Sequence, residues 1–303
     1  MASRLTRGQP SGDRKRGEAA AATRRQTNPA GDRKRGEAGH SESTGIHPDP
    51  RHRSTTEAMP KTTDTAATPD GTCAVRLFTP DGPGRWPGVV MFPDAGGVRD
   101  TFDRMAAKLA GFGYVVLLPD VYYREGDWAP FDMKTAFGDP QERARIMFMI
   151  GTLTPDRVTR DADALLNYLA SRPEVIGDRF GVCGYCMGGR MSVVVAGRLP
   201  DRVAAAAAFH PGGLVANSPD SPHLLADRIS ATVYIGGAEN DPSFTADHAE
   251  KLDKAFSAAG VPHRIECYPA AHGFAVPDNP SYDAAADERH WAAMTETFGA
   301  ALN

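Results

Sequence analysis

The chain has 303 residues, of which 41% are hydrophobic and 24% are charged, and its formal net charge is −4 at pH 7. This composition is ordinary for a soluble protein with one large or two small domains, and no apolar run approaches the roughly 18 residues that a membrane span needs. Residues 1–58 contain 12 Lys and Arg against 7 Asp and Glu, which leaves a net −9 for the remainder. Such an acidic body argues against a general nucleic-acid-binding surface.

The four cysteines are too few and too scattered to form a disulfide framework in a chain of this length. They are Cys73, Cys183, Cys186 and Cys267. The sequence has one CxxC pair and no second Cys or His pair at ligand spacing, so we expect no metal site and no cofactor. The N-terminus lacks the apolar core of a signal peptide, and we therefore expect a cytoplasmic protein without a membrane partner.

Residues 1–58 are rich in Arg, Gly, Ala, Ser, Thr and Pro and contain almost no large apolar side chains. Such a segment cannot offset the entropy cost of ordering its backbone. The octet GDRKRGEA occurs twice in it, at Gly12–Ala19 and at Gly31–Ala38. We interpret 1–58 as a disordered basic tail, which would not belong to the natural protein if translation starts at Met59. A linker over 59–71 and one domain over 72–303 follow.

From Cys73 onward, short apolar runs alternate with segments of helical periodicity. The expected strands are Cys73–Thr79, Gly88–Phe92, Tyr114–Leu118, Phe180–Gly184, Ala204–His210, Ala231–Gly237 and Arg264–Tyr268. The expected helices cover about Thr101–Phe112, Gln141–Gly151, Pro155–Ser171, the segment after Cys186, Ser243–Ala259 and Tyr282–Ala301. This alternation predicts an α/β fold with one mostly parallel, doubly wound sheet flanked by helices. Active residues of such sheets lie at the carboxyl ends of strands.

The segment 179–197 reads RFGVCGYCMGGRMSVVVAG, an apolar strand that turns sharply and continues as a helix. Gly184 and Gly188 lie two residues either side of Cys186, and glycine tolerates the crowding at such a turn because it lacks a Cβ. The N-terminus of the following helix offers positive partial charge and unpaired N–H groups to a thiolate or an oxyanion. We predict Cys186 as a nucleophile and Cys183 as buried filler on the strand.

A thiol nucleophile needs a base, and the base needs an orienting acid. Asp241 follows an expected strand in the loop AENDP, and His272 follows another in PAAHGF. The order nucleophile, acid, histidine is the order found in α/β-hydrolases. Glu239 and Asp247 are rival acids, and Asp241 could instead cap the helix after Pro242.

Other residues at expected strand ends are candidates for the pocket. His210 follows a strand in FHPGG, and we expect it to shape the pocket floor rather than to act in catalysis. Asp94, in the loop PDAGG, would lie beside the thiol and could hold its proton, although an exposed turn aspartate is an equal alternative. Backbone N–H groups of Met187 and Ala95 would form the oxyanion site.

The segment 121–139 is aromatic and irregular, and loops of this length in a compact domain are usually functional. We interpret it as a wall or lid of the pocket, with Tyr123 and Arg124 as contacts. Arg143 and Arg160, like Arg124, could supply an anion site. The aromatic residues favour an apolar or aromatic group in the substrate.

Four ordered motifs together resemble the dienelactone hydrolase family of α/β-hydrolases over roughly 72–302. They are GYCMGG around Cys186, FPDAGGV followed by GYVVLLPDVY, AENDP, and AHGF. The resemblance implies a triad of Cys186, His272 and Asp241. It also implies an acidic residue at Asp94, where the best-known members have Glu. Those members carry an Arg that binds the substrate carboxylate near the position of Val276.

The function that this resemblance implies is hydrolysis of an ester or lactone. Cys186 would attack the carbonyl, a thioester would form, and His272 would activate the water that releases it. The alternative from another class is a thiol–disulfide oxidoreductase that uses Cys183 and Cys186 of the CxxC motif. A third possibility is an α/β-hydrolase scaffold without catalysis that serves for binding. We expect a monomer or homodimer with a small-molecule substrate.

Overall fold

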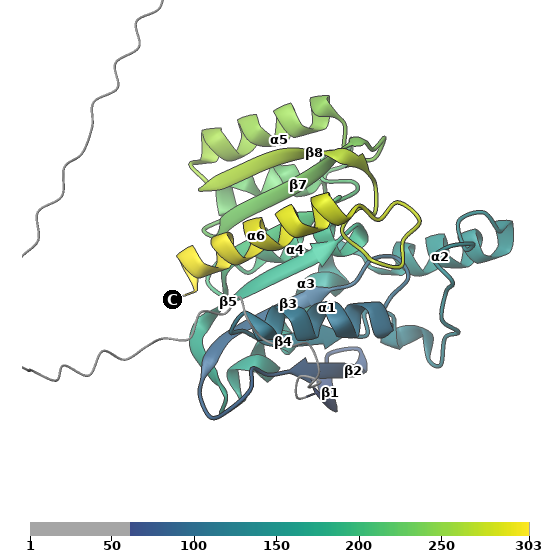
Figure 1. The fold of residues 1–303 in the computed structure, drawn as a ribbon. Helices are drawn as coiled ribbons and strands as arrows, with labels where there is room; N and C mark the ends of the chain where they lie inside the picture. Colours follow the sequence, from purple (N-terminus) through teal and green to yellow (C-terminus); the bar gives the residue numbers. More distant parts are fainter. Residues whose placement is uncertain (1–60, 303) are drawn as a thin grey trace, which may run out of the picture. The chain divides into compact units, whose positions relative to one another are not determined.

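A computed structural model describes residues 61–302, which form an eight-stranded sheet with helices on both faces (Figure 1). The strands are β1 Lys61–Thr68, β2 Gly71–Phe78, β3 Trp86–Phe92, β4 Val115–Pro119, β5 Val175–Tyr185, β6 Val203–Phe209, β7 Thr232–Asn240 and β8 His263–Ala271. The helices are α1 Asp100–Gly111, α2 Pro140–Thr152, α3 Pro155–Ala170, α4 Met187–Arg198, α5 Ala246–Ala259 and α6 Ala284–Ala301, with short 3-10 helices η1 Tyr123–Glu125 and η2 Pro222–Arg228. The tail predicted over 1–58 lies outside the described residues.

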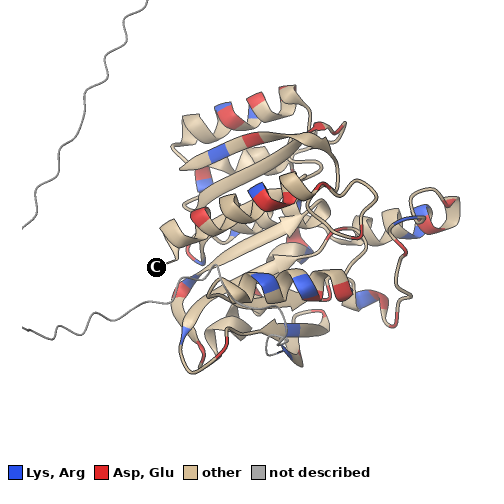
Figure 2. Ribbon diagram, in the orientation of Figure 1, with Lys and Arg blue, Asp and Glu red and all other residues tan. Residues whose placement is uncertain are grey.

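The order of strands is β1-β2-β4-β3-β5-β6-β7-β8, and the six strands from β3 to β8 pair in parallel. β2 runs antiparallel to both β1 and β4. The central strands β3, β4 and β6 carry no charged residue, and Figure 2 shows the charged residues mainly on helices and loops. Continuous apolar runs of this kind are typical of strands covered on both faces. The prediction of a mostly parallel, doubly wound sheet is confirmed.

Helices cover the sheet on two sides, and each side has its own buried core. On one side α1 and α6 pack through residues such as Phe102 and Met294, together with the alternate side chains of the strands. On the other side, α3, α4 and α5 contribute Leu166, Val193 and Phe256 to a second cluster. The two cores hold the sheet rigid, so the loops at its carboxyl edge start from fixed points.

The expected linker over 59–71 is corrected by the structure, because residues 61–68 form strand β1 at the edge of the sheet. β1 and β2 form a hairpin in which Ala66 pairs with Cys73. Ala66 is the one fully buried residue of β1, whose other side chains are mainly exposed. The sequence KTTDTAAT therefore lacks the apolar alternation that reveals most strands.

Strand ends bring the predicted site residues to one edge of the sheet. Cys186 directly follows β5, Asp241 directly follows β7, and His272 directly follows β8. The carboxyl ends of parallel strands meet at the same edge, and the three side chains therefore start from neighbouring positions. Within residues 61–302, no helix has both the length and the hydropathy that crossing a membrane requires.

Candidate active site

The turn between β5 and α4 presents Cys186 in a strained backbone conformation. Its φ is 54° and its ψ is −114°, and Cys186 is the N-cap residue of α4. A Cβ on Gly184 would lie 2.2 Å from the carbonyl oxygen of Gly188, and a Cβ on Gly188 would lie 2.4 Å from that of Phe92. The expected need for glycine on both sides of Cys186 is confirmed. Strain of this kind in a residue other than glycine persists where the surrounding packing enforces it.

His272 bonds to Asp241 and lies within the electrostatic reach of Cys186. Nδ1 of His272 donates to Oδ2 of Asp241 at 2.6 Å. The Cys186 side chain is near enough to the imidazole to raise the pKa of His272. Oδ1 of Asp241 accepts hydrogen bonds from the backbone N–H and the hydroxyl of Ser243, at 2.8 and 2.5 Å. The carboxylate is therefore fixed on both oxygens, and Ser243 is a part of the site that the sequence did not reveal.

The electrostatics of this arrangement favour a charged imidazole. Burial alone lowers the pKa of His272, but the hydrogen bond to Asp241 and the nearby Cys186 side chain outweigh burial and raise that pKa to about 10. Burial tends to raise the pKa of Asp241, yet its bonds from His272 and Ser243 hold it below its usual value. An ionised Asp241 beside a protonated His272 can stabilise a thiolate at Cys186.

The rival assignments for the acid do not reach His272. Thr245, rather than Asp241, is the N-cap residue of α5, and its side chain accepts from His248. Asp247 lies in the first turn of α5, and the side chain of Glu239 is exposed. Among the residues that the structure describes, Asp241 is the carboxylate bonded to His272.

His210 lies against His272 without sharing a hydrogen bond with it. Their ring centroids are 5.1 Å apart in an edge-on arrangement. His210 is completely buried, and within residues 61–302 neither of its ring nitrogens has a hydrogen-bond partner. Burial, followed by the nearby charge of His272, lowers its pKa well below the usual range, so the ring is neutral. This position fits the expected role of His210 in shaping the floor of the site.

The two predicted oxyanion donors come from adjacent elements. Met187 is the first residue of α4, and N–H groups in the first turn of a helix have no partner within that helix. Ala95 is buried in the loop after β3, where Gly96 N–H bonds to Oδ1 of Asp94 and Gly97 N–H to its carbonyl. Nothing in the described part of the chain accepts a hydrogen bond from Ala95 N–H. Both amides are therefore available to an oxyanion.

Asp94 is engaged by an arginine rather than by the thiol. Nη1 and Nη2 of Arg99 bind its two carboxylate oxygens at 2.7 and 2.9 Å. The same guanidinium binds Asp278 through Nε and Nη2, at 2.7 and 2.8 Å. Arg99 thus ties the loop after β3 to the loop that follows His272. The expected contact between Asp94 and Cys186 is not among the hydrogen bonds of the described residues.

The structure does not bring Tyr123 and Arg124 into the site, which corrects their assignment as pocket contacts. The hydroxyl of Tyr123 bonds to Thr68 and Asp161, at 2.7 and 2.9 Å. Arg124 binds both oxygens of Asp161 at 2.7 Å and also binds Asp70. The short helix η1 directs both side chains toward the hairpin of β1 and β2. There the Arg124 guanidinium pairs with the carboxylates of Asp70, in the hairpin, and Asp161, in α3.

The other arginines proposed for an anion site are also away from Cys186. Arg160 pairs with Asp70 at 2.9 Å, and Arg143 is exposed on α2. Neither forms a contact with the triad in the described structure.

The aromatic residues of 121–139 form a wall over the loop after β3, and Tyr122 is the most buried of them; their expected role in lining the substrate pocket stays a prediction. The ring of Trp128 packs edge-on against Tyr122 and stacks on Phe131. A Cβ on Gly97 would lie 2.6 Å from the Trp128 ring, so the loop of Ala95 needs glycine to pass beneath this wall. The sequence did not single out Tyr122, because an irregular segment lacks the helical or strand periodicity that shows which side chains point inward.

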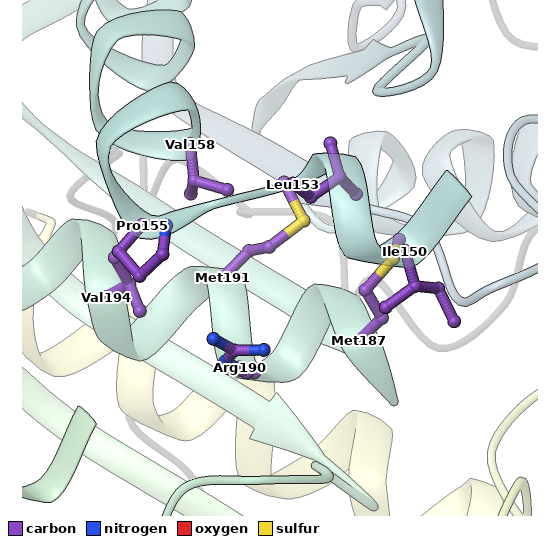
Figure 3. Close-up of a pocket in the computed structure, with 8 residues that line it drawn as sticks. All are labelled: Ile150, Leu153, Pro155, Val158, Met187, Arg190, Met191 and Val194. Carbon is purple, nitrogen blue, oxygen red and sulfur yellow. The ribbon is translucent and has the colours of Figure 1, made fainter. Parts of the chain in front are cut away.

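A small, mainly apolar pocket lies between α4 and the junction of α2 and α3 (Figure 3). Figure 3 shows Met187 and Met191 extending toward Ile150 and Leu153. The lining residues are Ile150, Leu153, Pro155, Val158, Met187, Arg190, Met191 and Val194. The volume of the pocket is about 10 Å³, room for one water molecule, and neither Cys186 nor His272 lines it.

Comparisons with known proteins agree with this architecture. The model of the dienelactone hydrolase family matches residues 73–302. A protein of Escherichia coli O157:H7 named "Putative carboxymethylenebutenolidase" is 31% identical over 224 residues, covering 72% of this chain and 78% of its own. The dienelactone hydrolase-like promiscuous phosphotriesterase P91, from metagenomic libraries, is 26% identical with a TM-score of 0.66, covering 80% and 99%. The structure titled m3DLH is 26% identical with a TM-score of 0.68, covering 82% and 100%.

The sheet, its flanking helices and these structural neighbours define an α/β-hydrolase fold. Within that class, the chain belongs to the dienelactone hydrolase family. It is accordingly a hydrolase that acts on ester bonds, of the carboxylic ester or lactone type.

Proposed function

We propose that this protein hydrolyses carboxylic esters or lactones through a Cys-His-Asp triad and a thioester intermediate. The observation that supports the proposal best is the arrangement in which Asp241 bonds to His272 and the Cys186 side chain lies near enough to His272 to raise its pKa. It links three loops that are far apart in sequence, and it ends on a thiol in a strained turn at a helix N-terminus. That combination is what an activated nucleophile requires.

The reaction proceeds in two balanced steps. The Cys186 thiolate attacks the carbonyl carbon, and the oxygen takes up the negative charge facing the N–H groups of Met187 and Ala95. The carbon–oxygen bond to the alkoxide then breaks, the His272 imidazolium protonates the leaving oxygen, and a thioester remains. In the second step, neutral His272 takes a proton from water as the water attacks the thioester. The acid leaves, and the sulfur regains its thiolate form beside the protonated imidazole.

The residues next to the proposed oxyanion site are apolar or aromatic. Met187 directly follows Cys186 and is buried, and the buried Tyr122 contacts its sulfur. The printed name of the Escherichia coli relative denotes a butenolide as that protein's substrate. We therefore propose unsaturated lactones and small aryl esters as the first substrates to test.

The oxidoreductase alternative finds less support. Cys183 is fully buried in the core cluster on the side of α1 and α6, whereas Cys186 packs against the cluster on the opposite side of the sheet. Burial also raises the pKa of the Cys183 thiol, which makes it a poor partner in thiol exchange. A redox cycle would leave the bond between His272 and Asp241 without a role.

The proposal is tested with a panel of neutral and anionic esters and lactones, assayed with the wild type and with Cys186→Ala. Cys186→Ala should lose at least about 10³-fold in turnover, because the nucleophile is removed. Rapid acid quenching during turnover of a slow substrate should add the mass of the acyl group to the peptide that contains Cys186.

Cys183→Ala is the matched control, since it removes a thiol within β5, three residues before Cys186. It should keep most of the activity once folding has been verified. Full turnover by Cys186→Ala, or complete dependence on Cys183, would overturn the proposed mechanism.

A further inference from the structure

Tyr122 connects the two elements that would form the oxyanion site. Its hydroxyl donates to the carbonyl oxygen of Ala95 at 3.0 Å and lies 3.3 Å from the sulfur of Met187. Ala95 belongs to the loop after β3, and Met187 begins α4. No other side-chain hydroxyl in residues 61–302 contacts both of these residues. The side chain of Tyr122 thus touches the two residues whose N–H groups we propose as the oxyanion donors.

Tyr122 is itself held firmly in place. It is 1% exposed, and its backbone N–H donates to Oδ1 of Asp120 at 3.0 Å. The indole N–H of Trp128 donates to the same carboxylate, and the Trp128 ring packs edge-on against the Tyr122 ring at 5.6 Å. A buried aromatic ring with fixed neighbours has few ways to move, so the position of its hydroxyl is well defined.

The hydroxyl also lies in the electrostatic field of the site. Burial is the largest cause that raises the pKa of Tyr122, and the charges of Asp94 and Cys186 raise it further. The phenol therefore stays protonated, and it remains a hydrogen-bond donor while negative charge develops nearby.

We propose that Tyr122 is a positioning residue for the oxyanion site, an inference that rests on the proposed function. By donating to the Ala95 carbonyl and contacting the Met187 thioether, its hydroxyl sets the spacing between the Ala95 and Met187 amides. The charge on the oxyanion exists in the transition state and not in the bound substrate. A change in this spacing therefore alters kcat much more than KM.

The test is Tyr122→Phe, which removes one oxygen atom and keeps the ring. Complete deletion of an oxyanion donor typically costs 10²- to 10³-fold, so loosening two donors should lower kcat on the order of tenfold, with KM within about twofold. A second readout is the affinity for a small trifluoromethyl ketone. Its carbonyl carbon bonds to the Cys186 sulfur, and its oxygen becomes an anion in the same site. This affinity should fall by the same factor as kcat/KM.

Tyr168→Phe is the matched control. Tyr168 lies in α3, and its hydroxyl makes one side-chain hydrogen bond, to Asp64 of β1 at 2.8 Å. The substitution removes that hydroxyl and keeps the ring. All measurements are made well below the unfolding temperature of each variant, and this control should keep wild-type kcat and ketone affinity.

Parallel losses of kcat and ketone affinity in Tyr122→Phe alone would support the proposal. It would be overturned by unchanged kcat, by a rise in KM that accounts for the whole loss, or by unchanged ketone affinity. In each of those cases an active wild type would leave the proposed function intact. A wild type that neither turns over any ester nor binds the ketone would instead refute the proposed function itself.

Discussion

Two polar clusters in this molecule carry similar residues and have opposite properties. One cluster, which we propose to be catalytic and call the catalytic cluster, consists of Asp241, His272 and Cys186; the other, the edge cluster, consists of Arg124, Asp161 and Asp70. In the edge cluster, Arg124 binds both oxygens of Asp161 and one of Asp70, so each charge faces an opposite one. In the catalytic cluster the charges of Asp241 and His272 are matched, and a sulfur is left at the end.

The difference shows what distinguishes a reactive site from a structural ion-pair cluster. The side chain of His272 is 31% exposed and that of Arg124 is 11% exposed, although both are bonded to buried carboxylates. The catalytic cluster therefore stays open to a substrate, while the edge cluster pins the hairpin of β1 and β2 to η1 and α3. A cluster of charged residues at strand ends therefore indicates a reactive site only if one member keeps an accessible atom that is not paired with an opposite charge.

The largest effect expected from this comparison is that of Asp241→Asn. Asparagine keeps the shape of the side chain but loses the charge that orients and protonates His272, and turnover should fall by about 10³- to 10⁴-fold. The pH profile gives a second measurement. Activity of the wild type should decline as pH rises through about 10, where His272 loses its proton. In Asp241→Asn this alkaline limb should move to lower pH, because the contact that raises the pKa is weakened.

The corresponding change in the edge cluster is Asp161→Asn, and it should leave the pH profile and the turnover of the wild type unchanged. An equal loss of turnover in both variants would mean that the two clusters do not differ in the way described here.

A smaller effect is expected when Arg124 is replaced by methionine, which keeps much of the apolar stem. The buried carboxylate of Asp161 would lose its ionic partner, and the free energy of unfolding should drop by about 2–3 kcal/mol. Denaturant unfolding measures this drop, while kcat and KM should stay within about twofold of the wild type. A rise in KM that is confined to anionic substrates would instead indicate that Arg124 contacts the substrate.

The smallest effect concerns the pH dependence of stability. His272 has a pKa of about 10 in the folded protein against 6.5 for an unperturbed histidine, so the folded state keeps a proton that the unfolded state releases. The stabilisation is complete below pH 6.5 and is lost as pH rises to about 10. Solvent screens a side chain that is about one third exposed, and we expect a loss of only about 1–2 kcal/mol.

The measurement is the difference in unfolding free energy between the wild type and His272→Gln, taken across this range of pH. For the edge cluster, the difference between the wild type and Arg124→Met should be flat over the same range, because Arg and Asp keep their charges. A flat difference for His272→Gln would show that its proton is not bound more tightly in the folded state.

Much of the fold could be predicted because its signals are local. Buried parallel strands read as continuous apolar runs, and the predicted strand around Cys183 falls inside β5. The glycines that flank Cys186 reveal the turn, since a Cβ at either position would collide with backbone. Each triad residue directly follows a strand, and strand ends can be recognised from a loss of apolar residues and the appearance of Gly, Pro or Asp.

The contacts between loops could not be predicted in this way. Arg99 binds Asp94 and also Asp278, which lies 179 positions from Arg99 in the sequence. Arg124 binds Asp70, which lies 54 positions away. Tyr122 and Tyr123 are adjacent and alike, yet one turns toward Ala95 and the other toward Thr68. In an irregular segment, packing against other parts of the chain decides these directions.

The sequence by itself determined the α/β architecture, the turn at Cys186 and the order of nucleophile, acid and histidine. The tertiary structure alone decided that Arg99 holds Asp94, that the Tyr122 hydroxyl bonds to the Ala95 carbonyl and that Arg124 belongs to the edge cluster. The physical reason is that backbone periodicity and turn chemistry depend on near neighbours in the chain. The partner of a charged or hydroxyl group depends on which loops the completed sheet brings together.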